Sequence, residues 1–355
     1  MVTTAEDIAQ WPNGVEADDA FQAHLLQGVS RTFALTIPQL PERLRRVVGN
    51  AYLLCRIVDT IEDEALLGAP EKRLFCERFA RVASGEAAAE RFAAELHPRL
   101  SQHTPAAERE LIEVTPRVIA VTRRFNPAQR AALAECVAVM AGGMADFQER
   151  RDLRGLDRLE DMDRYCYYVA GVVGEMLTKL FCDYSPEIAV NHEPLMRLAV
   201  SFGQGLQMTN ILKDIWEDRR RGACWLPRDV FSRAGFDLAK LEPGQYRNEF
   251  GKALAELIAV AHGHLENAMS YTLLIPPRET GIRNFCLWAI GMALLTLRKI
   301  NRRKDFVTGA QVKISRRSVR ATILATRASV SSDLMLRSLF RLAGRGLPLV
   351  SADRP

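Results

Sequence analysis

Residues 52–64 read YLLCRIVDTIEDE, an apolar run that carries Arg56 and the acids Asp59, Glu62 and Asp63. No proline or glycine interrupts this run, and its apolar positions follow helical spacing rather than strict alternation. On a helix, Asp59 and Asp63 project from one face about one turn apart. Like charges at this spacing repel, and the cost grows in an apolar helix unless a cation neutralises the pair. The run therefore predicts a helix that bears either a solvated acidic end or a site for a hard divalent cation.

A second acidic motif, Asp214 to Asp218, reads DIWED and ends another mostly apolar run, GLQMTNILKDIWED. The polar residues before it continue the helical spacing of three and four: Gln207, Asn210 and Lys213. This predicts a polar stripe along an apolar helix. If the two acidic helices face each other, they form an acid-lined cavity that needs several metal ions.

Composition describes an ordinary globular chain. It has 355 residues, 48% hydrophobic and 26% charged, with a net charge of +5. Its seven cysteines are scattered without a CxxC pair, which is typical of a reducing cytoplasm. The N-terminus is polar and acidic, unlike a secretory signal, and no uninterrupted apolar run approaches the roughly 20 residues that span a bilayer. We expect a cytoplasmic protein that is soluble or attached to a surface.

Long helical patterns dominate, and alternating β-branched runs are essentially missing, which predicts an all-α fold of about ten or more helices. We expect helices over residues 41–67, 106–124 and 193–220, and one or two basic amphipathic helices over 315–344. No segment is rich enough in Pro, Gly or Ser to divide the chain. The predicted organisation is a loose arm at 1–19, one catalytic domain at 20–345 and a tail at 346–355.

Several function classes lack their motifs. The six histidines show no HExxH or other zinc-ligand spacing. Neither GxGxxG after a strand nor GxxxxGK[ST] occurs, so a nicotinamide cofactor would bind without a Rossmann fold. No interleaved basic and aromatic pattern indicates nucleic acid.

Three features leave alternatives open. Arg56 lies three residues before Asp59, as either a structural ion pair or a guanidinium that grips phosphate. Gly171 and Gly174 interrupt a helix that begins with tyrosines, which close helix packing or a pocket-lining break would explain. Tyr165 is either a core aromatic or a proton donor and acceptor at a cavity.

Seven motifs in order make the chain resemble the squalene synthases of the squalene/phytoene synthase family, from about Ala20 to Ala325. They are SRTF at 30–33, YLLCRIVDTIED at 52–63, GGMADF at 142–147, YCYYVAGVVG at 165–174, QMTNILKDIWED at 207–218, RNFC at 283–286 and VKI at 312–314. The resemblance implies a single-domain, all-α isoprenoid-synthase bundle around a central cavity with two aspartate-rich helices. It also implies two farnesyl diphosphate substrates, Mg²⁺ and NADPH, with squalene formed through presqualene diphosphate.

The same resemblance implies roles for individual residues. The metal ligands would be Asp59, Glu62, Asp63, Asp214 and Asp218. Tyr165 would transfer a proton, while Tyr52, Arg56, Gln207 and Asn210 would lie around the diphosphates. Substrate binding or the reductive step would involve Ser30, Arg31 and Phe33, and NADPH would contact Arg31, Arg56, Lys213 and Lys313. The hydrophobic pocket would be lined by Gly174, Leu177, Phe285 and Cys286.

The chain departs from the eukaryotic pattern at three places. Ser315 replaces an arginine after VKI, which puts the nucleotide contacts there in doubt, and RNFC continues without the eukaryotic proline. The eukaryotic C-terminal membrane anchor is not found, so we expect a bacterial-type, soluble or peripheral enzyme without a transmembrane segment. The basic residues of 315–344 form either a solvated face or a docking surface for anionic lipid. The oligomeric state stays open.

Three alternatives to a squalene synthase are kept. A relative could stop at presqualene diphosphate or make dehydrosqualene. A terpene cyclase would use acidic helices and Mg²⁺ on one diphosphate without NADPH. A catalytically silent helical scaffold would lose nothing when Asp59 or Asp214 is replaced by Asn.

Overall fold

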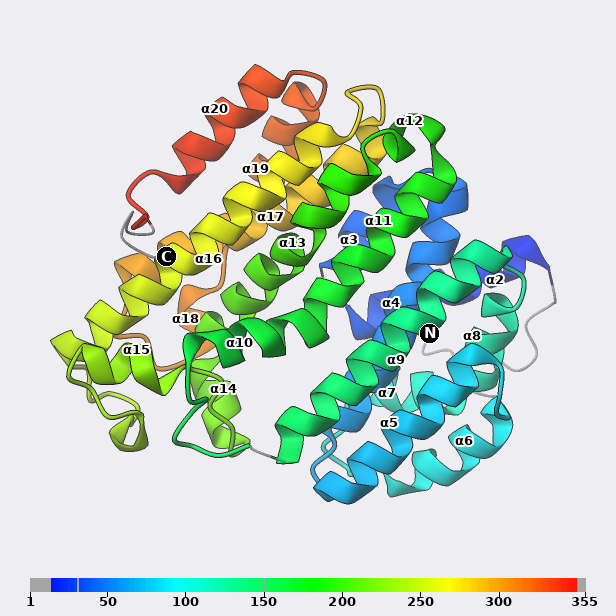
Figure 1. Ribbon diagram of the computed structural model, residues 1–355, viewed down its shortest axis with the longest axis horizontal. Coiled ribbons are helices and arrows are strands. Elements are labelled where there is room, and N and C mark those ends of the chain that lie inside the picture. The colour runs from blue at the N-terminus through cyan, green and yellow to red at the C-terminus, as the bar shows by residue number, and fades with distance from the viewer. Residues whose placement is uncertain (1–13, 31, 150, 350–355) are drawn as a thin grey trace. The chain divides into compact units, whose positions relative to one another are not determined.

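The computed structural model describes residues 14–30, 32–149 and 151–349 (Figure 1). Within these ranges the protein is built from helices, and the only strand-type pairing is an isolated bridge between Leu156 and Pro227. The all-α prediction is therefore confirmed. The helices are α2 (Val15–Val29), α3 (Phe33–Thr36), η1 (Ile37–Gln39), α4 (Glu42–Asp63), α5 (Ala69–Ser84), α6 (Ala89–Leu96), η2 (His97–Arg99), α7 (Ala106–Glu113), α8 (Thr115–Thr122), α9 (Pro127–Glu149), α10 (Leu159–Cys166), η3 (Tyr167–Gly171), α11 (Val172–Tyr184), α12 (Pro186–Ala189), α13 (His192–Lys213), α14 (Ile215–Arg220), α15 (Arg228–Arg233), η4 (Leu238–Lys240), α16 (Asn248–Leu274), α17 (Thr280–Arg302), α18 (Gly309–Val312), α19 (Arg316–Ser329) and α20 (Asp333–Gly344).

The chain divides into two compact units. The first comprises the described residues up to Glu149 together with Met176–Ala189, and the second comprises the described residues from 151 to Glu175 and from Val190 onward. Helix α11 begins in the second unit and continues in the first. One catalytic domain over 20–345 stays a prediction.

Helix α4 is the central element of the first unit. Its Leu53, Ile57 and Ile61 are fully buried, and the helix packs against α5, α7, α8 and α9. Figure 1 shows α5 lying along α9, which the contacts between these helices confirm. The core of this unit thus fixes the face on which the first acidic motif lies.

The prediction that the first acidic helix reaches residue 67 is wrong, because α4 ends at Asp63. Glu64 turns to an extended backbone at φ −64° and ψ 120°. Its carboxylate then accepts hydrogen bonds from the backbone N–H groups of Leu66 and Ser101, each at 2.9 Å. These hydrogen bonds hold Glu64 in a non-helical conformation against the chain that follows, and Asp63 is the last helical residue.

The predicted loose arm is also wrong in part. Residues 1–13 lie outside the described ranges, but Val15–Asp19 already belong to α2. Two acids in this stretch are ion-paired and not loosely solvated: Asp19 accepts from Arg46 at 2.7 Å, and buried Asp18 pairs with Arg124. These pairs anchor the start of α2 to α4 and to the end of α8.

The long helices α13, α16 and α17 form the centre of the second unit. Helices α19 and α20 pack on α17, and α20 also contacts α16 (Figure 1). One 18-residue window in α17 is long and apolar enough to cross a membrane by composition, yet 72% of it is buried inside the structure. Core helices of soluble proteins pass the same test, so α17 is weak evidence for a membrane span.

Two further helix predictions need correction. The helix expected over 106–124 is two helices, because the chain bends at Val114 (φ −90°, ψ 12°) just before Pro116. The helix expected over 193–220 breaks at Asp214 (φ −101°, ψ 15°), which separates α13 from α14. The basic segment at 315–344 is a pair of helices, one of the two forms expected.

Candidate active site

The first acidic motif occupies the C-terminal turn of α4. Asp59 is half-buried, and Asp63 one turn later is exposed. Desolvation raises the pKa of the Asp59 carboxyl to about 7; Arg56 opposes this rise, and the negative charge of Asp63 adds to it. The two carboxylates therefore interact unfavourably when both are ionised, and a bound cation would relieve that repulsion.

Arg56 is held by a buried acid on another helix. Its guanidinium forms a short ion pair with Glu108 of α7 and lies 3.6 Å from Asp59. Glu108 is only 6% exposed, and Thr60 donates to its other oxygen at 3.4 Å. The two carboxylates together raise the pKa of Arg56, although burial alone would lower it. The ion-pair interpretation of Arg56 is thus confirmed, while contact with a phosphate or NADPH stays a prediction.

Glu62, the residue before Asp63, is buried and has a protein partner of its own. Its carboxylate accepts a hydrogen bond from Gln148 of α9 at 2.8 Å, and Lys72 of α5 donates to its backbone carbonyl. Burial, followed by the charge of Asp63, raises the pKa of Glu62 to about 8. Its role as a third metal ligand stays a prediction, since its carboxylate already has a protein partner.

No group of three or more His, Cys, Asp or Glu side chains in the described part of the chain is arranged to hold a metal ion by itself. The acids instead occur as pairs one turn apart. Mg²⁺ is usually bound through one or two carboxylates together with waters and substrate phosphates. The paired acids fit that mode of binding rather than an all-protein cage.

The SRTF segment packs beside the same helix. Ser30 accepts from the backbone N–H of Phe33 at 2.9 Å, and the Phe33 ring lies 5.1 Å from the ring of Tyr52. Burial raises the pKa of Tyr52, a hydrogen bond with Ser30 opposes the rise, and the hydroxyl donates to the carbonyl of Val29 at 3.3 Å. The structure therefore brings together Ser30, Phe33 and Tyr52, three of the predicted site residues. Arg31, a fourth, lies outside the described residues.

The second acidic motif starts at the break between α13 and α14. Asp214 occupies the break, and its pKa is raised by burial, against the opposing charge of Lys213 at 3.0 Å. Lys213 also lies 3.5 Å from the side-chain oxygen of Asn210. Asp218 keeps the one-turn spacing, because its backbone N–H donates to the carbonyl of Asp214 at 2.9 Å. Gln207 lies one turn before Asn210 on α13 and is half-buried, so the predicted polar stripe exists.

The inner residues of this motif attach it to the segment after α17. Trp216 donates from its indole nitrogen to the carbonyl of Phe306 at 2.6 Å, and the backbone N–H of Gly309 donates to Glu217 at 3.1 Å. A Cβ at Gly309 would lie 3.0 Å from Asp214 Oδ1. The close approach explains why this position is glycine, and it holds the segment that leads to Lys313.

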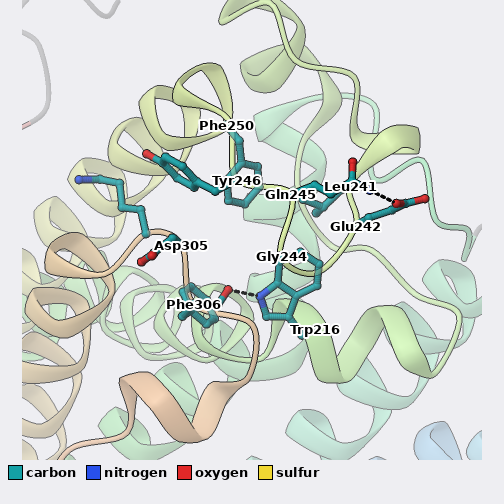
Figure 2. Close-up of a pocket in the computed structure, with 10 residues that line it drawn as sticks. Trp216, Leu241, Glu242, Gly244, Gln245, Tyr246, Phe250, Asp305 and Phe306 are labelled. Carbon is teal, nitrogen blue, oxygen red and sulfur yellow. Dashed lines mark hydrogen bonds between the residues drawn. The ribbon is translucent and has the colours of Figure 1, made fainter.

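Figure 2 shows a small hollow beside Trp216, in which the Trp216–Phe306 hydrogen bond is drawn. Its empty volume is about 230 Å³, which includes space open to solvent. The hollow is lined by Trp216, Leu241, Glu242, Gly244, Gln245, Tyr246, Phe250, Lys304, Asp305 and Phe306. We assign no ligand to it.

Tyr165 lies on α10 in the second unit. It is 4% exposed, and its ring stacks on Trp225 with centroids 4.1 Å apart and planes at 10°. The chain then forms a π-helical turn, η3, before α11 begins. Such turns are rare and are frequent at functional sites.

Close helix packing is confirmed for the glycines after Tyr165, and a break is present, while its role in lining a pocket stays a prediction. The helix is broken by the π-helical turn, and it also approaches α13 very closely. A Cβ at Gly174 would lie 2.1 Å from the carbonyl oxygen of Ala199, and one at Gly203 would lie 2.1 Å from that of Ala170. Glycine at these positions lets the two helices approach.

The predicted pocket-lining residues lie on two helices. Phe285 and Cys286 are buried in α17, where burial raises the pKa of the Cys286 thiol to about 12. Leu177 is half-buried in the part of α11 that belongs to the first unit. Their contact with a substrate stays a prediction.

The structure explains the departure at Ser315. Its hydroxyl accepts from the backbone N–H of Ser318 at 3.1 Å and so caps the N-terminus of α19. An arginine cannot make this cap, since its side chain has no acceptor. Lys313 just before it is exposed at the end of α18.

Sequence reasoning missed the residues that position the motifs: Lys72, Glu108, Gln148, Glu217, Trp225 and Gly309. Lys72 acts ten residues from Glu62, and the others act across long sequence separations. Glu217 lies inside the DIWED motif, but its spacing does not reveal its partner; the others stand in no pattern that separates them from ordinary surface or core residues. GGMADF, which ends at the residue directly before Gln148, was the nearest signal.

Comparison with known proteins assigns the family. The family model described as squalene/phytoene synthase matches residues 26–318. The chain belongs to this family. The squalene synthase of Eremothecium gossypii is 30% identical over 285 residues, which are 77% of this chain and 60% of that protein. Squalene synthase BSS of Botryococcus braunii is 28% identical over 319 residues, 88% of this chain and 65% of that protein. The chain thus spans less than two thirds of the length of these relatives.

Solved structures agree with the fold. A complex of TcSQS with the ligand E5700 is 25% identical, with a TM-score of 0.70 over 92% of this chain and 90% of that one. A dehydrosqualene synthase in complex with ligand is 19% identical, with a TM-score of 0.63 over 89% of this chain and 98% of that one, and shows the fold alone.

Proposed function

We propose that this protein is a squalene synthase. It condenses two molecules of farnesyl diphosphate to presqualene diphosphate and reduces that product to squalene with NADPH. Support comes from membership of the family and from relatives named squalene synthase at 28 to 30% identity. The motifs that carry the resemblance lie on helices that present acids, a buried tyrosine and close glycine contacts.

The observation that carries the proposal is the paired acids of Asp59 with Asp63 and Asp214 with Asp218. Burial raises the pKa of both Asp59 and Asp214, so each pair is poised to gain from a divalent cation. Magnesium bound there would neutralise a diphosphate as it leaves. An acid pair in each unit suits two substrates that each carry one diphosphate.

The remaining chemistry is assigned to the chain's own residues. Asn210 and Lys213 lie one helical turn and one residue before Asp214, where they can orient a diphosphate. The side chain of Tyr165 is proposed to accept the proton that the substrate loses when the cyclopropane closes. Stacking on Trp225 fixes the plane of its ring.

The fit to NADPH is only partial. Two of its proposed contacts, Arg56 and Lys213, already pair with carboxylates, while Lys313 is exposed. The reductive step therefore rests on the family resemblance, and no part of it is derived from these side chains.

A product assay tests the proposal. Purified protein with farnesyl diphosphate and Mg²⁺ should form presqualene diphosphate, and added NADPH should convert it to squalene. Presqualene diphosphate or dehydrosqualene as the final product would contradict the reductive assignment, and a cyclic product would contradict the condensation. Asp59→Asn should abolish turnover, whereas Glu77→Gln, an exposed acid on α5, should leave it unchanged. Equal activity of both variants would instead indicate a scaffold.

Cytoplasmic location with peripheral contact to membranes belongs to the same proposal. Its support is the basic surface of α19 and α20.

A further inference from the structure

The inner face of helices α19 and α20 packs against the second unit. Ile323, Val330, Leu336 and Phe340 pack in one cluster with Trp288 of α17. This cluster attaches the helix pair to the second unit. The exposed side chains on the outer side of the two helices are not part of this cluster.

That outer face is unusually apolar. Leu324 is 68% exposed, Leu334 73% and Leu342 64%, with Met335 at 50%. Of the eleven large hydrophobic side chains that are exposed in the described residues, four lie on α19 and α20, and a fifth, Leu349, follows α20. Single exposed leucines are ordinary, but this concentration on one helix pair marks a surface that interacts with something.

The same face is strongly basic. Seven arginines and one acid, Asp333, lie between residues 315 and 349. Asp333 is paired with buried Arg283 at 2.8 Å, and Arg327 lies over the Trp288 ring at 5.1 Å. The remaining arginines are exposed and have no described carboxylate within ion-pairing distance: Arg316, Arg317, Arg320, Arg337, Arg341 and Arg345.

The two kinds of side chain alternate at helical spacing. On α20, Leu334 is followed by Arg337 and Arg341, and Met335 by Leu342 and then Arg345 after the helix. On α19, Arg317 and Arg320 precede Leu324 on the exposed side. Leucines can thus enter the acyl boundary while neighbouring guanidinium groups stay among headgroup phosphates.

We propose that the outer face of α19 and α20 docks on an anionic lipid bilayer. The commitment to lipid follows from charge and chemistry, because net positive charge with exposed leucine and methionine matches an interfacial helix pair. A nucleic-acid surface would need exposed aromatic side chains for stacking, and the exposed large side chains here are aliphatic. The inference deepens the membrane contact of the proposed function by naming its surface and lipid charge.

Vesicle flotation of the full chain tests this surface without substrate. We expect binding to vesicles with about a third phosphatidylserine, little binding to pure phosphatidylcholine, and loss of binding as salt rises from about 0.1 M to about 1 M. Replacing Arg337, Arg341 and Arg345 by Ala should weaken binding about a hundredfold, since each arginine contributes roughly fivefold. The matched control replaces Arg43, Arg123 and Lys252, three exposed cations elsewhere, by Ala and should bind like the wild type.

A second pair of variants tests the apolar contribution without changing charge. Leu334→Ser with Leu342→Ser should weaken binding, whereas Leu66→Ser with Val190→Ser, equally exposed elsewhere, should not. Wild-type binding by both α20 variants, or equal loss in the controls, would overturn the proposal. It would also fail if light scattering shows a dimer that the α20 variants dissociate, because a second copy would then cover the face. Vesicle binding without squalene formation leaves the surface standing and refutes only the proposed reaction.

Discussion

Replacing Glu108 by Gln tests whether a buried acid holds Arg56 in place beside the first acidic motif. Glu108 is 6% exposed and pairs with a guanidinium that is 24% exposed, so the pair is largely removed from water. Removing one partner of a buried ion pair lowers the free energy of unfolding by about 3–5 kcal/mol. Because Arg56 is partly exposed, we expect a loss of about 3 kcal/mol, at the low end of this range. Urea denaturation at neutral pH measures this free energy of unfolding.

Glu135→Gln is the matched control. Glu135 pairs with Lys179 at 2.6 Å, but the two side chains are 58% and 35% exposed, so the loss should stay below about 1 kcal/mol. Glu108→Gln should also lower the pKa of Asp59, because Glu108 contributes repulsion to it and the released Arg56 then pairs with Asp59 alone. If the two Gln variants lose equal stability, the buried pair does not anchor Arg56 and the reasoning is refuted.

Three further outcomes are expected. Asp59 and Glu62 have pKa values raised to about 7 and about 8, so the folded state holds protons that the unfolded chain releases above about pH 4. Without metal, the free energy of unfolding should therefore fall as pH rises from about 4 to about 8, and Mg²⁺ should offset the fall; a rise over this range in EDTA would contradict this. Tyr165→Phe should cut turnover roughly hundredfold or more while the free energy of unfolding changes by less than about 1.5 kcal/mol; unchanged product formation would remove its proton role. Gly203→Ala should destabilise by at least about 3 kcal/mol in urea, whereas Gly142→Ala, with nothing within 4 Å, should stabilise slightly; equal effects would show that the close approach is unimportant.

The sequence predicted the all-α fold and the one-turn spacing of the acid pairs well, because both depend on spacing within one segment, but it did not predict where the helices end or break. Asp59 and Asp63 lie one turn apart as expected, and the glycines after Tyr165 mark both a break and a close contact. The break at Asp214 was not predictable, since neither proline nor glycine marks it. Glu108 could not be identified either, because three glutamates share its helix and only packing against α4 buries this one.

In both acidic motifs, the glutamate and the aspartates have different surroundings. In each, the glutamate just before the last aspartate has a protein partner. Glu62 accepts from Gln148, and Glu217 accepts from the backbone of Gly309. The aspartates one turn apart are left half-buried or exposed, where a cation and a phosphate can reach them. The glutamates thus attach each motif to its own unit, and the aspartates carry its charge outward.

This difference predicts that replacing Glu62 mainly lowers stability, whereas replacing its neighbour Asp63 mainly weakens Mg²⁺ binding. Glu62→Ala should lower the free energy of unfolding by about 1–3 kcal/mol, because it removes the hydrogen bond that buried Glu62 accepts from the Gln148 amide. Asp63→Ala should leave stability unchanged or raise it slightly, because it removes a repulsion on Asp59, yet it should weaken Mg²⁺ binding in the presence of pyrophosphate. Titration calorimetry and urea denaturation on the same two variants separate these effects. If Glu62→Ala loses Mg²⁺ binding at unchanged stability, then Glu62 is a direct ligand and its bond to Gln148 is incidental.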